Sequence, residues 1–136
     1  MKKTLILLLG VGVVVLGFYI FKSNISLAPE ESNQPKFFGQ NKILPTDTVV
    51  KIKETGFEPA EINIKRGMRV VWASEAPGYS WPASDPHPSH TNYPGFDPGE
   101  PLKTGEAWSF TFDKVGGWEY HNHLNPSHRG KIVVKD

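Results

Sequence analysis

Short apolar stretches, separated by glycine and proline, fill the chain from residue 46 to its last residue. The 136-residue chain contains 13 glycines and 12 prolines, together with four tryptophans and eight phenylalanines. Proline removes a backbone donor and breaks helices, and glycine weakens them. No helical period is present in this region, so the pattern predicts an all-β domain with many turns.

The expected strands follow from alternation of apolar and polar residues. Residues 61–65 alternate cleanly, and Trp108, Phe110 and Phe112 fall on one face at a period of two. Strands are predicted at residues 48–53, 61–65, 69–72, 106–112, 118–121 and 131–134. This spacing is typical of a β-sandwich or Greek-key barrel.

A proline-rich segment from Ser74 to about Pro101 is expected to be one long loop. Loops of this length in compact domains are usually functional or disordered. This one contains two histidines and several aromatic residues, which argues against disorder. Its prolines fix φ and stiffen it, so we expect it to hold functional side chains in place.

The N-terminal residues 1–22 predict a membrane anchor. Lys2 and Lys3 precede an apolar run from Thr4 to Phe21, which is near the minimum length for a membrane-spanning helix. The positive charges favour a cytoplasmic N-terminus and an extracytoplasmic domain. The alternative is a signal peptide and a secreted domain. The best cleavage site ends at Ala28 and is followed by proline, so we favour the uncleaved anchor.

Residues 23–45 are mostly polar and predict a flexible linker, which leaves 46–136 as the folded domain. The net charge is +1 and there is no basic run, so nucleic acid is not an expected partner. No hydrolase triad, phosphate-binding loop or carboxylate pair is recognisable. We therefore expect binding rather than catalysis.

Four of the five histidines form two clusters, and the chain has no cysteine. His121 and His123 point to the same side if their segment is extended, and the three-residue spacing of His87 and His90 suits a turn. Each pair taken alone is compatible with incidental polar residues. Together they predict that both pairs meet at one end of a β-sandwich around a metal ion.

Imidazole ligands without a thiolate suit Cu(II) first and Zn(II) as an alternative. Asp85 is either an acceptor that orients one of the histidine rings or a turn residue. The fifth histidine, His128, is expected in an exposed turn, with an additional ligand role left open.

The domain resembles the cupredoxins, the plastocyanin-like copper proteins. The residues that carry the resemblance are Gly56-Phe57-Glu58-Pro59, Val70-Val71-Trp72, Gly116-Gly117-Trp118-Glu119-Tyr120 and Gly130-Lys131-Ile132-Val133-Val134. The resemblance covers about residues 47 to 136 and implies a cupredoxin-like Greek-key fold.

The blue-copper ligands of that family are replaced in this chain. The resemblance puts His128 in the place of the methionine, Asn125 in that of the late histidine and Asn122 in that of the cysteine. The earlier histidine falls near Ser80. The chain thus resembles a cysteine-less, membrane-anchored subgroup.

Without a thiolate, copper is expected to stay cupric and to be bound, buffered or passed on. Two alternatives are an interaction module for another envelope protein and a copper oxidoreductase with an open coordination position.

Overall fold

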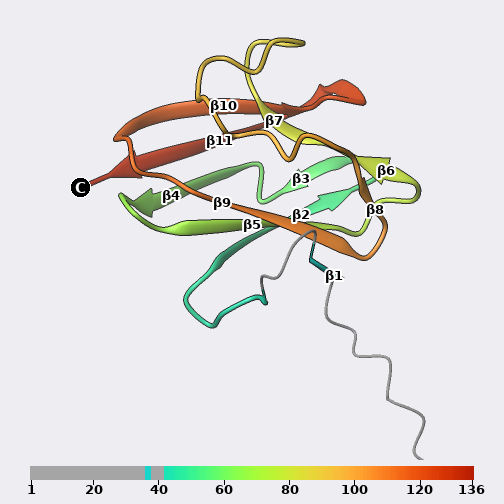
Figure 1. The fold of residues 1–136 in the computed structure, drawn as a ribbon, viewed down its shortest axis with the longest axis horizontal. Helices are drawn as coiled ribbons and strands as arrows, with labels where there is room; N and C mark the ends of the chain where they lie inside the picture. The colour runs from blue at the N-terminus through green and yellow to red at the C-terminus, as the bar shows by residue number, and fades with distance from the viewer. Residues whose placement is uncertain (1–35, 38–41) are drawn as a thin grey trace, which may run out of the picture. The chain divides into compact units, whose positions relative to one another are not determined.

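The computed structural model describes Lys36–Phe37 and residues 42–136, and these residues form β-strands, turns and loops (Figure 1). The larger sheet has the strand order β1-β9-β5-β2-β3. Its strands are β1 (Lys36–Phe37), β2 (Thr48–Lys53), β3 (Gly56–Glu58), β5 (Arg69–Ser74) and β9 (Glu106–Thr111). The pairs β1/β9 and β2/β5 are parallel, so crossover connections join the strands.

The second sheet has the order β4-β11-β10-β7. Its strands are β4 (Glu61–Lys65), β7 (Pro82–Ser84), β10 (Gly116–Asn122) and β11 (Asn125–Lys135). A small two-stranded sheet pairs β6 (Tyr79–Ser80) with β8 (Leu102–Lys103). The two large sheets lie as layers in Figure 1, with β10 and β11 in one layer and β9 and β5 in the other. The all-β prediction is confirmed for the described residues.

Aromatic side chains fill the space between the layers. Trp72 on β5 lies 4.8 Å from Phe96 and 5.6 Å from Tyr120 on β10, measured between ring centroids. Phe112 completes this group, and all four side chains are buried. Aromatic clusters of this kind combine a large buried area with favourable edge and offset contacts. They fix β10, whose C-terminal end carries the site described below.

Two expectations about irregular segments are wrong. The predicted loop between residues 74 and 101 contains β6 and β7, because Pro82–Ser84 pairs with Tyr120–Asn122 at the edge of the second sheet. The last strand begins at Asn125 rather than near Lys131, since the β10/β11 ladder continues past a register shift between His121 and Asn122. Both pairings are tertiary, so local alternation does not reveal them.

The expected anchor, residues 1–22, and most of the expected linker, residues 23–45, lie outside the described residues. Of that linker, Lys36–Phe37 pairs with Glu106–Ala107. Among the described residues no helix has the length and the apolar character that a membrane span requires. The domain boundaries and the membrane anchor therefore remain predictions.

Candidate metal centre

The structure brings four imidazole rings together at one end of the second sheet. His121 is on β10, and His123 is in the short turn between β10 and β11. His87 and His90 lie on the segment that follows β7. The ring centroids of the six pairs are between 4.7 and 6.5 Å apart. We call these four residues the histidine cluster.

The histidine cluster is closer to a square than to a tetrahedron. Each loop histidine lies 4.7–5.3 Å from each histidine at the end of β10, whereas His87 to His90 and His121 to His123 both measure 6.5 Å. The longer separations are about 1.3 times the shorter ones, against about 1.4 in a square and about 1 in a tetrahedron, so the four ring centres form a flattened arrangement. The two residues of each sequence pair therefore face each other across the cluster.

The segment that carries His87 and His90 is held to the domain by its neighbours. Tyr93 and Phe96 are buried in the core. The hydroxyl of Ser84, on β7, donates to the carbonyl of His90 at 2.9 Å and accepts from the N–H of Tyr93 at 3.3 Å. His90 itself adopts the left-handed conformation, with φ of 53°. Strained backbone of this kind persists where its surroundings determine it, often at functional sites.

His121 is the buried member of the cluster. Its side chain has no exposed surface, and its Nδ1–H donates to Oδ1 of Asp85 at 2.6 Å. The other oxygen of Asp85 accepts from Arg129, the cross-strand neighbour of His121. Burial lowers the pKa of His121, although Asp85 opposes this shift. The remaining nitrogen, Nε2, is buried and has no hydrogen-bond partner in the structure.

His90 is oriented in the same way by a different carboxylate. Its Nδ1–H donates to Oδ2 of Asp97 at 2.6 Å, and its Nε2 faces Nδ1 of His123 at 3.0 Å. With the proton of neutral His90 on Nδ1, His123 is the donor in this second bond. Two nitrogens that bind one metal ion at 2.0–2.1 Å also lie about 3 Å apart. The pair is therefore spaced as two neighbouring ligands would be.

His87 and His123 complete the cluster on the solvent side. His87 is exposed and His123 is half-buried. One nitrogen each from His87, His121 and His123 lie within 4.8 Å of one another. Burial, followed by the charges of His90 and His87, lowers the pKa of His123. Neutral imidazoles of these three residues at this spacing can hold a divalent cation.

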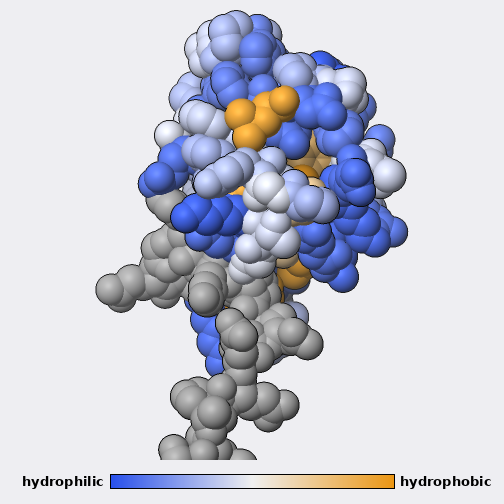
Figure 2. Space-filling model, turned by 90° about the vertical axis from the view of Figure 1, so that its right-hand side faces the viewer, coloured by the Kyte–Doolittle hydropathy of each residue, from blue (hydrophilic) through white to orange (hydrophobic). Residues whose placement is uncertain are grey.

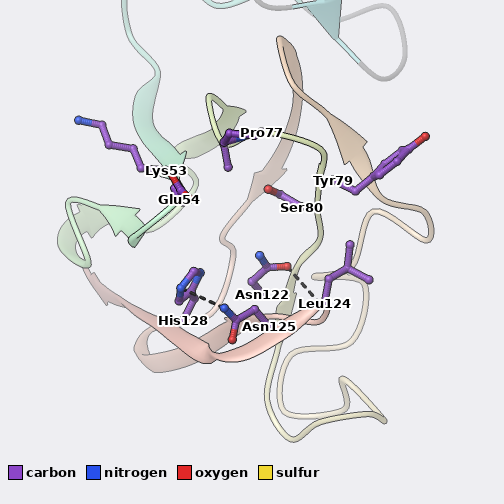
Figure 3. Close-up of a pocket in the computed structure, with 10 residues that line it drawn as sticks. Lys53, Glu54, Pro77, Tyr79, Ser80, Asn122, Leu124, Asn125 and His128 are labelled. Carbon is purple, nitrogen blue, oxygen red and sulfur yellow. Dashed lines mark hydrogen bonds between the residues drawn. The ribbon is translucent and has the colours of Figure 1, made fainter.

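The fifth histidine lies elsewhere, in a pocket of about 180 Å³ (Figure 3). His128 belongs to β11, is half-buried and faces the amide of Asn125, so its expected place in an exposed turn is wrong. Ser80 and Asn122 also line this pocket. These four residues occupy the positions that the resemblance assigns to blue-copper ligands, yet they offer one imidazole and no thiolate. They do not fit a blue-copper centre.

Asn122 has a backbone role beside the histidine cluster. Its side-chain oxygen accepts from the N–H groups of Trp81 and Leu124, at 2.9 and 3.2 Å. The N–H of His123 donates to the carbonyl of Trp81 at 2.7 Å. These bonds fix the turn that carries His123 and bring the Trp81 ring to 4.7 Å from the His123 ring.

Sequence reasoning missed one functional residue, Asp97. Its position before proline and glycine is that of an ordinary turn aspartate, and its oxygen does accept from the N–H of Gly99 at 2.7 Å. The available signal was its place seven residues after His90 within the same stiff segment. For Asp85 the sequence left two roles open, a ring-orienting acceptor or a turn residue. The structure shows the contact that orients the ring of His121.

Comparison with solved structures shows the fold. A purple cupredoxin from Nitrosopumilus maritimus is 20% identical, with a TM-score of 0.57, over 65% of this chain and 100% of that chain. A reduced variant of amicyanin is 24% identical, with a TM-score of 0.61, over 77% of this chain and 95% of its own. A second variant, in the reduced Cu(I) form, is 26% identical with the same TM-score and the same coverage.

The comparison with protein-family models gave no match, and neither did the comparison with curated protein sequences. The structural likeness covers nearly the full length of each neighbour.

Proposed function

We propose that this cupredoxin-like domain binds one Cu(II) ion through His87, His90, His121 and His123 and takes part in copper handling outside the cytoplasm. The role is binding, buffering or transfer of copper rather than rapid electron transfer. Zn(II) is the alternative occupant. The cupredoxin neighbours support a copper-binding fold, and the absence of cysteine separates the proposed centre from a blue-copper centre.

The single observation that carries the proposal is the buried, unpartnered Nε2 of His121. Leaving a buried polar atom without a partner is unfavourable by about 1–3 kcal/mol. Its Nδ1 is already bonded to Asp85, so Nε2 is the nitrogen with a free lone pair. Nitrogens of His87 and His123 lie within 4.8 Å of a nitrogen of His121. A cation among these nitrogens would give Nε2 of His121 the partner that it lacks in the structure.

The choice of Cu(II) rests on the donor set and its shape. Divalent copper binds nitrogen ligands more tightly than zinc does, and it prefers tetragonal geometry, whereas zinc prefers a tetrahedron. The nearly square cluster supports the first geometry. Bound to imidazole without sulfur, copper would remain cupric and only weakly coloured.

The extracytoplasmic place of the domain is proposed from the N-terminal sequence. The basic residues followed by the apolar run from Thr4 to Phe21 favour a single-pass anchor with the domain on the outer side. N-terminal sequencing of the mature protein from membranes tests this proposal. A mature chain that begins near Pro29 would replace the anchor with a cleaved signal peptide.

Electron paramagnetic resonance of the copper-loaded domain tests the centre directly. The proposal expects one copper per chain and a large parallel hyperfine splitting, as thiolate-free tetragonal copper gives. A small splitting with intense blue colour would contradict the ligand set. Silence after addition of Cu(II), combined with zinc in protein purified without chelator, would move the proposal to Zn(II).

Calorimetry on variants tests which histidines bind. The double variant His87→Ala/His121→Ala should lose most of the affinity for Cu(II), because it removes two of the four nitrogens. His128→Ala is the matched control, since it removes an imidazole from the separate pocket. Equal affinities in the wild type and the double variant would end the proposal.

A role as an interaction module has less support. The face of the domain in Figure 2 is mainly hydrophilic, with small separate hydrophobic areas. Leu124 and Tyr79 are exposed hydrophobic residues in the described part of the chain, and both line the pocket of Figure 3. Binding partners without any metal binding would favour this role.

A further inference from the structure

Three donors converge on the carboxylate of Asp97. They are Nδ1–H of His90 at 2.6 Å, Nε1–H of Trp81 at 2.8 Å and the backbone N–H of Gly99 at 2.7 Å. Trp81 and Gly99 both donate to Oδ1, while His90 donates to Oδ2. Each carboxylate oxygen therefore accepts from its own donors, and these bonds fix the orientation of the carboxylate plane.

This contact decides which nitrogen His90 presents. The ring of His90 is almost fully buried, with 7% of the side chain exposed. Since Asp97 holds the proton on Nδ1, the lone pair of neutral His90 is on Nε2, the atom that faces His123. Metal-binding histidines commonly depend on such a carboxylate partner for both tautomer and orientation.

Asp97 differs from Asp85 in its charge balance. Asp85 orients His121, but its charge is compensated by the guanidinium of Arg129. Among residues 42–136, the carboxylate of Asp97 contacts His90 but no lysine or arginine. No cationic lysine or arginine side chain of these residues thus compensates the carboxylate of Asp97 beside the cluster.

We propose that Asp97 is a positioning residue that presents Nε2 of His90 to the metal ion, and that its uncompensated negative charge selects Cu(II) over Cu(I). The inference rests on the proposed copper centre. Four neutral imidazoles carry no charge, so a nearby carboxylate adds an electrostatic preference for a divalent over a monovalent ion to the preference that the ligand type and arrangement give. A carboxylate that is separated from the metal ion by one ligand ring attracts a divalent ion more strongly than a monovalent ion, because the site is partly buried.

Two substitutions separate the two effects. Asp97→Asn removes the charge and keeps a single oxygen acceptor, which serves either Nδ1–H of His90 or the two donors on Oδ1, Trp81 and Gly99. Asp97→Ala removes both. Affinities for Cu(II) and for Cu(I) are each measured by competition with chelators of known strength. Loss of such an outer partner commonly weakens metal binding by about 10–100-fold.

The expected result for Asp97→Asn is a loss of Cu(II) affinity of this size, with a clearly smaller loss for Cu(I). For Asp97→Ala, both affinities should fall. Glu119→Gln is the matched control, because it removes one negative charge from the exposed face of β10 and should change neither affinity. Equal losses for the two ions in Asp97→Asn, with the wild type binding copper, would overturn the selectivity and leave the proposed function standing.

The positioning role has a readout that needs no metal. Nitrogen-15 spectra of the metal-free wild type should show His90 with its proton on Nδ1, and Asp97→Ala should shift His90 toward the other tautomer. An unchanged tautomer in a folded Asp97→Ala variant would overturn the positioning role. Absence of copper binding by the wild type itself would instead overturn the proposed function.

Discussion

Gly130 lies directly opposite Tyr120 in the ladder between β10 and β11, and the phenol ring occupies the space that a side chain at Gly130 would need. A Cβ atom there would lie 2.3 Å from Cζ of Tyr120. Tyr120 is fully buried and precedes His121. The close approach of the Tyr120 ring to the backbone of Gly130 thus determines the position of His121 on β10.

Gly130→Ala should therefore destabilise the domain. The added methyl group meets a buried aromatic ring that has no free space, and overpacking of this kind costs about 1–3 kcal/mol. Urea unfolding of the metal-free protein measures the change. Gly117→Ala is the control in the same ladder, because its Cβ would meet only the flexible end of Lys131 at 3.4 Å. Equal losses in both variants would contradict the account.

Asp85→Ala should weaken Cu(II) binding by about 10–100-fold, since a ligand without its carboxylate partner loses its fixed orientation. The metal-free domain should also lose about 1–3 kcal/mol, because Nδ1–H of buried His121 loses its acceptor. Calorimetry and urea unfolding measure the two effects. Arg129→Gln serves for comparison: its side chain is 53% exposed, so its loss should change stability by no more than about 1 kcal/mol. A larger effect for Arg129→Gln than for Asp85→Ala would reverse these roles.

Tryptophan fluorescence should report copper binding through one residue. Trp81 lies 4.7 Å from the ring of His123, so a paramagnetic Cu(II) ion in the cluster should quench its emission, whereas Zn(II) should not. Trp81→Phe should abolish most of the quenching while Trp72, Trp108 and Trp118 still emit. Because this substitution also removes the hydrogen bond from Nε1–H to Asp97, calorimetry has to show that the variant still binds copper. Quenching that persists in Trp81→Phe would place the ion elsewhere.

Acid should act on the domain in two ways. The pKa values of His121 and His123 lie below the ordinary value of 6.5, mainly through burial. The unfolded chain takes up these protons near pH 6.5, before the folded domain does. The metal-free domain should thus lose stability as the pH falls from 6.5 through the lowered pKa values. Protons also compete with copper for the same nitrogens, so affinity should fall below about pH 6.

Thermal unfolding of metal-free and copper-loaded protein across this pH range measures both effects. The melting temperature of the metal-free domain should fall on acidification, and the rise in melting temperature that copper causes should become smaller. A rise that stays constant well into the acid range would contradict imidazole ligands.

The regular strands could be predicted from the sequence because each has one buried face. In β4, Ile62 and Ile64 are buried while Glu61, Asn63 and Lys65 are exposed, which is the alternation that identifies a strand. Strand β7 could not be predicted in this way. Its residues Pro82–Ser84 are all buried, and only pairing with the end of β10 makes them a strand.

The residues of the candidate site also differ in whether the sequence could predict them. The two histidine pairs are visible in the sequence because their spacing is local. Asp97 is not, because its partners Trp81 and His90 are 16 and 7 residues away and are joined to it by the folded loop. The position of His128 in a separate pocket also depends on the tertiary pairing of β11.

His90 and His123 are 33 residues apart in the chain, yet their rings are in contact. An ion shared by the histidine cluster would tie the segment after β7 to the end of β10, as a disulfide does in proteins that have cysteine. Unlike a disulfide, this cross-link would form and open with the supply of the ion. The resistance of residues 85–97 to protease would then increase with the amount of available copper.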